Sequence, residues 1–178
     1  MNLWLRLIWM LITLPWRPRV ALLASSKLGM IVLPNDLDFN GHVNNGRYLT
    51  LADVARMDLM LRTGAARVAW RHRALPIVGD ALAKFRRDLK PLQRFDVHSR
   101  VMGWEGKWVF MEHRFMAGGR VSGVVVVRGL LRGPQGNLDP QALAEALGEH
   151  GPSPSLPAWV LEWSQSCESL SQSLRDEE

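Results

Sequence analysis

The sequence predicts an α+β domain in which one long helix lies against a curved antiparallel sheet. A helical pattern over residues 47–63 is apolar on almost all sides, which is typical of a helix enclosed by other structure. Strand-like segments follow it over residues 77–133, joined by short turns at 104–107 and 117–119. Short turns between successive strands favour an antiparallel meander. One helix layer packed on one sheet is an α+β arrangement.

The long helix has a recognisable end and recognisable surface pairs. Gly64 follows its last turn and can adopt the left-handed conformation that closes many helices. Asp53 with Arg56, and Asp58 with Arg62, have the spacing at which opposite charges meet on a helix surface. These pairs should decorate a helix that is otherwise buried.

Five strands and one further helix complete the predicted domain. The strands are expected at residues 28–33, 77–89, 95–103, 108–116 and 120–133. The run Val124–Val127 is entirely apolar, so its strand should be central or buried on both faces. A short helix should begin at Pro140, with Asp139 as its cap, and stop at Gly148.

The chain divides into three segments by composition. Residues 1–26 are apolar and rich in tryptophan, residues 27–148 form the domain, and residues 149–178 are a linker and tail rich in proline and serine. A length of 178 residues favours one compact domain. The polar, serine-rich end is expected to be loosely held.

The amino-terminal segment leaves two interpretations open. Its apolar run over residues 7–14 follows Arg6 and stops at Pro15, whereas a membrane span needs about 20 apolar residues. A secretory signal is conceivable, but the basic residues after the run and the absence of a clear cleavage site oppose it. A short helix that packs on the domain, or one that lies at a membrane interface, fits better.

The formal charge of +5 and the pI of about 10.1 indicate attraction to anions. No nucleic-acid reader motif or basic helix is present, so nucleic acid is not an expected partner. The single cysteine, Cys167, cannot form an internal disulfide, which agrees with a cytoplasmic location. The five histidines lack metal-ligand spacing, and no Gly-x-Ser-x-Gly elbow is present, so neither a metal site nor a serine triad is expected.

The polar stretch "DLDFNGHVNNGRYL", residues 36–49, is the candidate reaction site. Turn and cap chemistry alone would explain some of its Asp, Asn and Gly residues. Asp38, Asn40 and His42, however, are spaced two apart, so an extended segment would point them to one side. The helix that follows offers unpaired N–H groups and the positive end of its dipole. Together these groups could orient water and stabilise an oxyanion.

The same stretch resembles the signature loop of the hot-dog-fold acyl thioesterases. The pattern D-x-D-x-N-x-H-x-N-N-x-x-Y is similar to that of the fatty acyl-carrier-protein thioesterases and the 4-hydroxybenzoyl-CoA thioesterase-like group. The "NGRYLT" and "KFRR" segments are similar to a subgroup of small thioesterase-like proteins. The resemblance covers about residues 27–132 and implies a hot-dog fold, in which an antiparallel curved sheet wraps one long helix.

The resemblance also implies an activity and roles for individual residues. The activity is hydrolysis of acyl-CoA or acyl-carrier-protein thioesters in fatty acid metabolism. Asp38 takes the position of the catalytic acid, which activates water or attacks the carbonyl directly. His42 and Asn40 match its polar partners, and the backbone N–H of Asn45 matches the donor that polarises the carbonyl. The catalytic cysteine of the plant-type enzymes has no counterpart here, because Cys167 lies in the tail.

Substrate contacts are expected from two segments. Asn44 and Tyr48 belong to the motif, while Lys84, Arg86 and Arg87 lie in a basic segment that suits coenzyme A phosphates or an acidic carrier protein. Strand alternation would point Lys84 and Arg86 one way and Arg87 the other, and a solvated strand face explains the segment equally well.

The resemblance implies a homodimer or a dimer of dimers, with the site between subunits. No cofactor is expected beyond the coenzyme A or phosphopantetheine of the substrate itself. The alternative function is a non-hydrolytic acyl-binding or scaffold protein, associated with a membrane through its tryptophan-rich end. A location in the cytoplasm, with possible membrane association, suits both.

Overall fold

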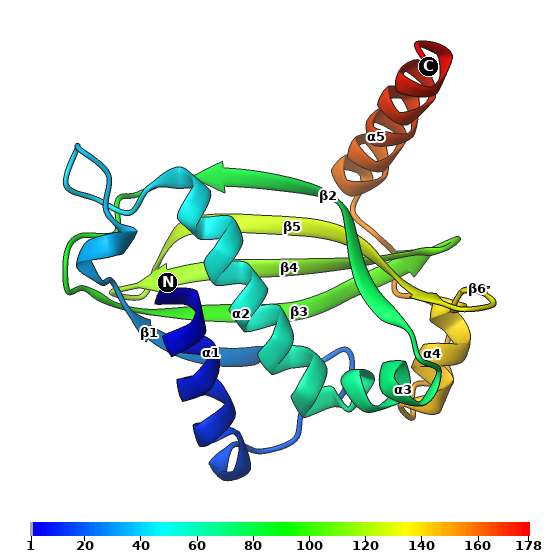
Figure 1. The fold of residues 1–178 in the computed structure, drawn as a ribbon, viewed down its shortest axis with the longest axis horizontal. Helices are drawn as coiled ribbons and strands as arrows, with labels where there is room; N and C mark the ends of the chain where they lie inside the picture. Colours follow the sequence, from blue (N-terminus) through cyan, green and yellow to red (C-terminus); the bar gives the residue numbers. More distant parts are fainter. Residues whose placement is uncertain (1) are drawn as a thin grey trace.

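The computed structural model describes residues 2–178, apart from the side chain of Asn2, and shows a curved sheet around a central helix (Figure 1). All strand pairs are antiparallel, in the order β1-β3-β4-β5-β2, and β6 pairs with the end of β5. The strands are β1 Ser26–Ile31, β2 Leu75–Phe85, β3 Arg94–Glu105, β4 Trp108–Ala117, β5 Arg120–Gly133 and β6 Gly136–Asn137. The predicted α+β architecture is therefore confirmed.

The central helix is α2, Asn45–Thr63, and it lies in the concave side of the sheet (Figure 1). Asn44 is its N-cap, because the Asn44 side chain accepts a hydrogen bond from the Gly46 amide at 2.8 Å. Gly64 ends it with a φ of 87°, as predicted. Both expected ion pairs of the helix are present, but the Asp58–Arg62 pair is buried, with Asp58 0% exposed, rather than at the surface. Its core-facing residues Leu51, Val54 and Ala55 are at most 1% exposed.

Strand β5 is buried on both faces, as its apolar run predicts. Val125 and Val127 pack in the core that contains α2. Val126 points to the outer face, where it packs with Phe110 and with Val160 of the carboxy-terminal helix. The sheet is thus covered on its convex side as well as on its concave side.

Helix α1, Asn2–Thr13, packs beside α2, and a short turn η1, Leu14–Trp16, follows it. Met10 is 1% exposed, and Arg17 donates a 2.7 Å hydrogen bond to Asp58 of α2. No helix in the described part of the chain has both the length and the apolar character needed to traverse a bilayer.

Two short helices close the end of the domain where β2 begins. Helix α3, Ala65–Arg71, continues directly from α2 and was not expected. Helix α4, Pro140–Ala146, was predicted, and Asp139 caps it by accepting a hydrogen bond from the Gln141 amide at 3.2 Å.

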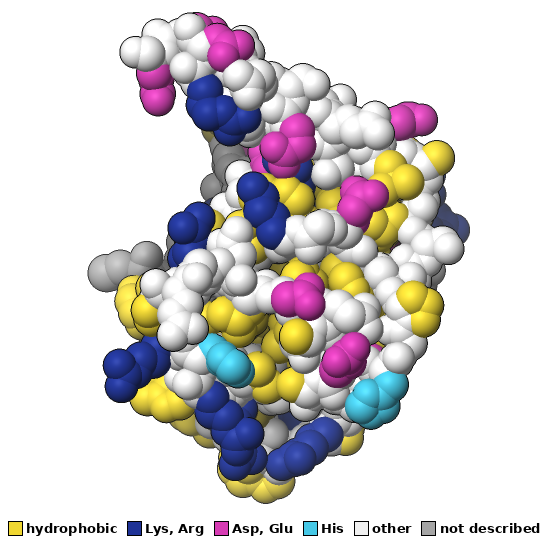
Figure 2. Space-filling view, turned by 90° about the vertical axis from the view of Figure 1, so that its right-hand side faces the viewer, with side chains coloured by type: hydrophobic (Ala, Val, Ile, Leu, Met, Phe, Trp, Pro, Cys, Tyr) yellow, Lys and Arg dark blue, Asp and Glu magenta, His cyan; other side chains and the backbone are white. Residues whose placement is uncertain are grey.

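The expectation of a loose tail is wrong, because residues Ala158–Asp176 form the helix α5. Val160, Ser164 and Cys167 recur at helical spacing and are buried on the outer face of the sheet. Arg128 of β5 is 1% exposed and donates a 2.9 Å hydrogen bond to Glu168 of α5. The far half of α5 projects beyond the domain and carries polar side chains (Figure 2). Serines occur in both halves of α5, and Ser164 is itself buried, so the serine-rich composition did not indicate that the segment packs.

Candidate functional site

The polar loop after η2, Pro34–Asp36, reverses direction in a tight turn. The Asp38 amide donates to the His42 carbonyl at 2.9 Å, and the Gly41 amide donates to the Asp38 carbonyl at 3.1 Å. Gly41 has a φ of 76°, which favours glycine there. The expected extended segment is therefore wrong. Asp38 and His42 come together because the chain folds back, not because alternate side chains share a face.

Asp38 and His42 form a half-enclosed polar pair at this turn. His42 Nδ1 lies 3.7 Å from Asp38 Oδ1, and the two side chains are 31% and 14% exposed. The Asn40 amide donates to Asp38 Oδ1 at 2.9 Å, which fixes the carboxylate orientation, while the residue itself is exposed at the turn. Phe39, beside them, is 97% exposed. The carboxylate keeps acceptor capacity that these contacts do not use.

Asp36, two residues earlier, is fully buried and serves the fold. Its carboxylate accepts a 2.9 Å hydrogen bond from the Leu33 amide, and it forms ion pairs with Arg47 of α2 at 3.1 Å and with Arg6 of α1. Burial lowers the pKa of Arg6, and the charge of Asp36 opposes that shift. Asp36 therefore ties α1, the loop and α2 together.

The start of α2 supplies a donor next to this loop. The Asn44 backbone is held by a 2.9 Å hydrogen bond from its amide to the Asp36 carbonyl, and its side chain caps the Gly46 amide. Asn45 is the first residue of the helix, where backbone N–H groups lack intrahelical acceptors. Within residues 2–178, no acceptor is paired with the Asn45 amide. The positive end of the helix dipole lies at the same point.

Tyr48 lies in the core rather than on the surface of the site. It is 3% exposed, and its ring makes edge contacts with Phe85 and Phe115 at centroid distances of 5.1 and 4.8 Å. Burial raises the pKa of Tyr48 to about 12, so its phenol is neutral at physiological pH. A Cβ on Gly123 would lie 2.9 Å from the Tyr48 ring, so the ring requires glycine there. The structure gives Tyr48 a packing role.

The basic segment lies beside the polar loop. Strand β2 ends at Phe85, before the expected limit, so Arg86 and Arg87 follow the strand instead of alternating within it. Lys84, Arg86 and Arg87 are exposed. The Val43 amide donates to the Leu89 carbonyl at 3.0 Å, which joins this segment to the loop that carries Asp38.

A small apolar cavity of about 60 Å³ lies between α2 and the beginning of β2. Most of its lining residues come from α2 and from strands β2, β4 and β5, and they include Leu59, Met60, Ile77, Val78, Met111 and Leu130. Arg56 is its only charged lining residue within the described chain. The polar loop lies at the opposite end of α2.

One buried titratable group went unrecognised in the sequence. His113 of β4 is 0% exposed, and its Nδ1 lies 2.8 Å from Ser99 Oγ. Burial, and secondarily the charge of Arg56, lowers the pKa of His113 to about 3. Its alternation with Met111 and Phe115 was a signal that it points inward. His113 is therefore a neutral core histidine.

The residues that the structure describes contain no recognisable metal-binding cluster. In that part of the chain, no group of three or more His, Cys, Asp or Glu side chains is arranged to hold an ion.

Comparison with known proteins gives consistent matches. The thioesterase-like superfamily matches residues 32–164. Protein THEM6 of Xenopus laevis is 33% identical over 149 residues, covering 83% of this chain and 70% of the relative. Thioesterase lcsJ of Purpureocillium lilacinum is 30% identical over 107 residues, covering 48% of this chain and 34% of the relative.

Solved structures agree on the fold. The YbaW probable thioesterase from Escherichia coli has a TM-score of 0.64 at 20% identity, covering 70% of this chain and 96% of the other. BH1999 gentisyl-coenzyme A thioesterase has a TM-score of 0.59 at 15% identity, covering 68% and 98%. The predicted hot-dog fold is thereby confirmed.

Proposed function

Because this chain belongs to the thioesterase-like superfamily, we propose that it hydrolyses acyl thioesters of coenzyme A or an acyl-carrier protein to a free acid and a thiol. One observation carries the proposal. The Asp38 carboxylate is half enclosed and oriented, and its loop leads directly into the first turn of α2. A purely structural role for Asp38 would leave this geometry unexplained, because Asp36 already holds the loop in place.

In the proposed reaction, Asp38 acts as a general base toward water or attacks the carbonyl carbon itself. In the first route, Asp38 takes a proton as the water oxygen bonds to the carbonyl carbon. The tetrahedral intermediate then collapses, the C–S bond breaks, and the thiolate leaves and takes up a proton. In the second route, an acyl anhydride forms with loss of the thiolate, and water then releases the acid.

The other loop residues support that carboxylate. The Asn45 amide and the α2 dipole stabilise the oxyanion as charge develops on the carbonyl oxygen. The Asn40 amide holds Asp38 in one orientation. His42, 3.7 Å away, acts as a positioning partner for Asp38 or for the water.

We assign the thiol end of the substrate to the basic segment. Lys84, Arg86 and Arg87 are exposed and lie on the segment that Leu89 joins to the polar loop. Guanidinium groups match phosphate geometry, so these side chains suit the phosphates of coenzyme A or the acidic surface of a carrier protein.

We assign the acyl end to the space between α2 and β2. The cavity of about 60 Å³ there is apolar, but it is no larger than about two waters occupy in the liquid. Flexible Met60 and Met111 side chains in its wall can move aside for a larger group. Ala81 and Ala83 of β2 lie in line with the core-facing Val127 and Val125 of β5, so β2 presents small side chains toward α2.

The proposed enzyme is a homodimer joined through β2. This strand is a sheet edge, and it exposes Leu75, Ile77 and Val78, which are 70%, 43% and 40% exposed. Exposed apolar edge strands pair readily with another chain. A second copy at this edge would also lie close to the open side of the α2–β2 space and complete its wall.

Thiol release from a panel of acyl-CoA chain lengths tests the proposal. Wild type should release thiol, and Asp38→Asn should not, whereas Asp53→Asn, at a position of α2 where the side chain is 54% exposed, should keep full activity. Wild-type protein that binds acyl-CoA without releasing thiol would instead identify a non-hydrolytic acyl-binding protein.

A further inference from the structure

Helix α1 is apolar toward solvent as well as toward the domain, where Leu3 and Leu7 pack against the core. Its inward face carries Arg6, whose side chain is 10% exposed, and Met10, which is 1% exposed. Its outward residues are all large and apolar, each between 51% and 70% exposed: Trp4, Leu5, Ile8, Trp9, Leu11 and Ile12. A helix that packs on a domain in water normally has a polar outer face. A contiguous exposed apolar face of this kind marks an interaction surface.

Cations border this outward face of α1. Trp16, just after the helix, is 79% exposed, and Arg19 close to it is exposed. On the other side, a cavity of about 970 Å³ separates α1 from the edge strand β1. Trp9 and Leu5 line it from α1, and Lys27 and Arg94 line it from the sheet.

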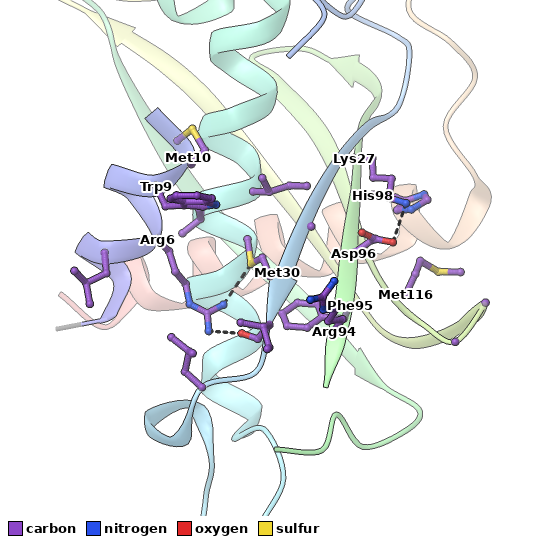
Figure 3. A pocket seen from close by; sticks show the side chains of 18 residues that line it. Arg6, Trp9, Met10, Lys27, Met30, Arg94, Phe95, Asp96, His98 and Met116 are labelled. Atoms are coloured by element: carbon purple, nitrogen blue, oxygen red, sulfur yellow. Dashed lines mark hydrogen bonds and ion pairs between the residues drawn. The ribbon is translucent and has the colours of Figure 1, made fainter. Parts of the chain in front are cut away.

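The close-up of this cavity shows how its two walls differ (Figure 3). Arg6 points from α1 to the backbone of β1, where it donates to the Ile31 carbonyl at 2.9 Å. Lys27 projects from β1 itself, Arg94 and Asp96 belong to the neighbouring strand β3, and Lys27 pairs with Asp96 at 2.9 Å. Apolar side chains and cations therefore share one opening at this edge of the molecule.

We propose that the outward face of α1 docks on the surface of an anionic lipid bilayer. The helix lies in the plane of the interface, with its apolar face among the upper acyl chains. Tryptophan side chains concentrate at this depth of a membrane, because the ring is apolar and its N–H remains near water. Arg19, Lys27 and Arg94 then meet lipid phosphates, consistent with the overall charge of +5.

A bilayer fits this face better than a second copy of the chain. A symmetric contact through α1 would bring the border cations of one copy toward those of the other, and like charges oppose association. The α1 side lies along β1, whereas the proposed dimer uses β2 at the opposite edge of the sheet. Dimerisation through β2 would thus leave α1 open and provide two anchors per dimer, which strengthens surface binding. The docking does not depend on the chemistry at Asp38.

Vesicle flotation of the full chain tests this proposal. Vesicles of phosphatidylcholine alone are compared with vesicles that contain about one third phosphatidylserine, a fraction that gives a negative surface. Wild type should float with both, and the anionic vesicles should carry more protein at low salt than at high salt.

Three outward tryptophans provide the main variant. Trp4→Gln, Trp9→Gln and Trp16→Gln together should lower vesicle binding about tenfold or more, because they remove the interfacial side chains. The variant leaves the buried face of α1 intact, and an unchanged circular dichroism spectrum and thiol release without vesicles would show that it folds. Trp70→Gln is the matched control, since Trp70 is 85% exposed on α3 and should not affect binding.

A charge variant gives a second readout. Arg19→Glu with Arg94→Glu should reduce binding to anionic vesicles and leave binding to neutral vesicles unchanged. The proposal is overturned if wild type floats with neither vesicle, or if Trp70→Gln loses as much binding as the triple variant. It is also overturned if the triple variant lowers the sedimenting mass of the protein in vesicle-free solution, because α1 would then be a protein interface.

Discussion

Asp36 and Asp38 stand two positions apart in one loop, yet their surroundings assign them opposite tasks. Asp36 is 0% exposed, and two arginines and a backbone amide occupy the acceptor sites of its carboxylate. Asp38 is 14% exposed and accepts from the Asn40 amide, with His42 nearby. A carboxylate whose acceptor sites are filled cannot receive a proton from water without breaking its ion pairs. The difference separates the acid that holds the loop from the acid to which we assign the proposed reaction.

His113 and His42 repeat this contrast. His113 is fully enclosed, bonded to Ser99 and neutral, while His42 is 31% exposed beside Asp38. In each comparison the buried residue is fixed by its surroundings in the core. The partly exposed residue, Asp38 or His42, remains accessible to a ligand. Stability and activity should therefore respond to different members of each pair.

The Asp38→Asn substitution should have the largest effect, and that effect should be on catalysis. The amide cannot take a proton from water or attack a carbonyl, so kcat should fall about a thousandfold, equivalent to about 4 kcal/mol. The free energy of unfolding in urea should stay within about 0.5 kcal/mol of wild type, because the side chain is not part of the core. A variant that turns over normally would remove Asp38 from the mechanism.

Asp36→Asn should act on stability instead. Removing the carboxylate leaves Arg6 and Arg47 without their buried partner, which should cost roughly 3 kcal/mol of unfolding free energy. Urea denaturation of this variant measures the loss. Asp53→Asn is the control, because the Asp53 side chain is 54% exposed, so loss of its ion pair with Arg56, which is 13% exposed, should cost only about 1 kcal/mol. Equal effects of the two substitutions would contradict the role given to Asp36.

His113 should make the fold sensitive to acid. Its pKa is about 3 in the folded state and about 6.5 when unfolded, so the unfolded chain binds more protons between those values. Its contribution is therefore complete above pH 6.5 and is lost as the pH falls toward 3. From pH 7 to pH 5 the loss should be about 2 kcal/mol.

Urea titrations across this pH range provide the measurement. His113→Asn cannot titrate there, so it should be less stable than wild type at pH 7 but should lose less stability on going to pH 5. An identical pH dependence in both proteins would mean that His113 is not the group responsible.

The contrast between the acids explains what the sequence could and could not predict. The apolar pattern of α2 and the run Val124–Val127 sufficed for the architecture, since local periodicity encodes which faces are buried. The spacing of Asp38 and His42 within four residues marked the candidate site. The role of Asp36 depends on Arg6, thirty positions away, so no local pattern contains it. Helix α5 was missed because only its first half packs, and the buried positions there include the polar Ser164, so the apolar signal is weak.

Substitution of His42, the proposed partner of Asp38, should have the smallest effect. His42→Ala should lower kcat about tenfold, because the carboxylate or the attacking water loses a neighbour 3.7 Å away but the reacting group remains. His42→Asn, which keeps a polar side chain, should recover part of that loss. If His42 acts only through Asp38, adding His42→Ala to Asp38→Asn should reduce the residual rate no further. A full additional tenfold loss in the double variant would mean that the imidazole contributes to catalysis on its own.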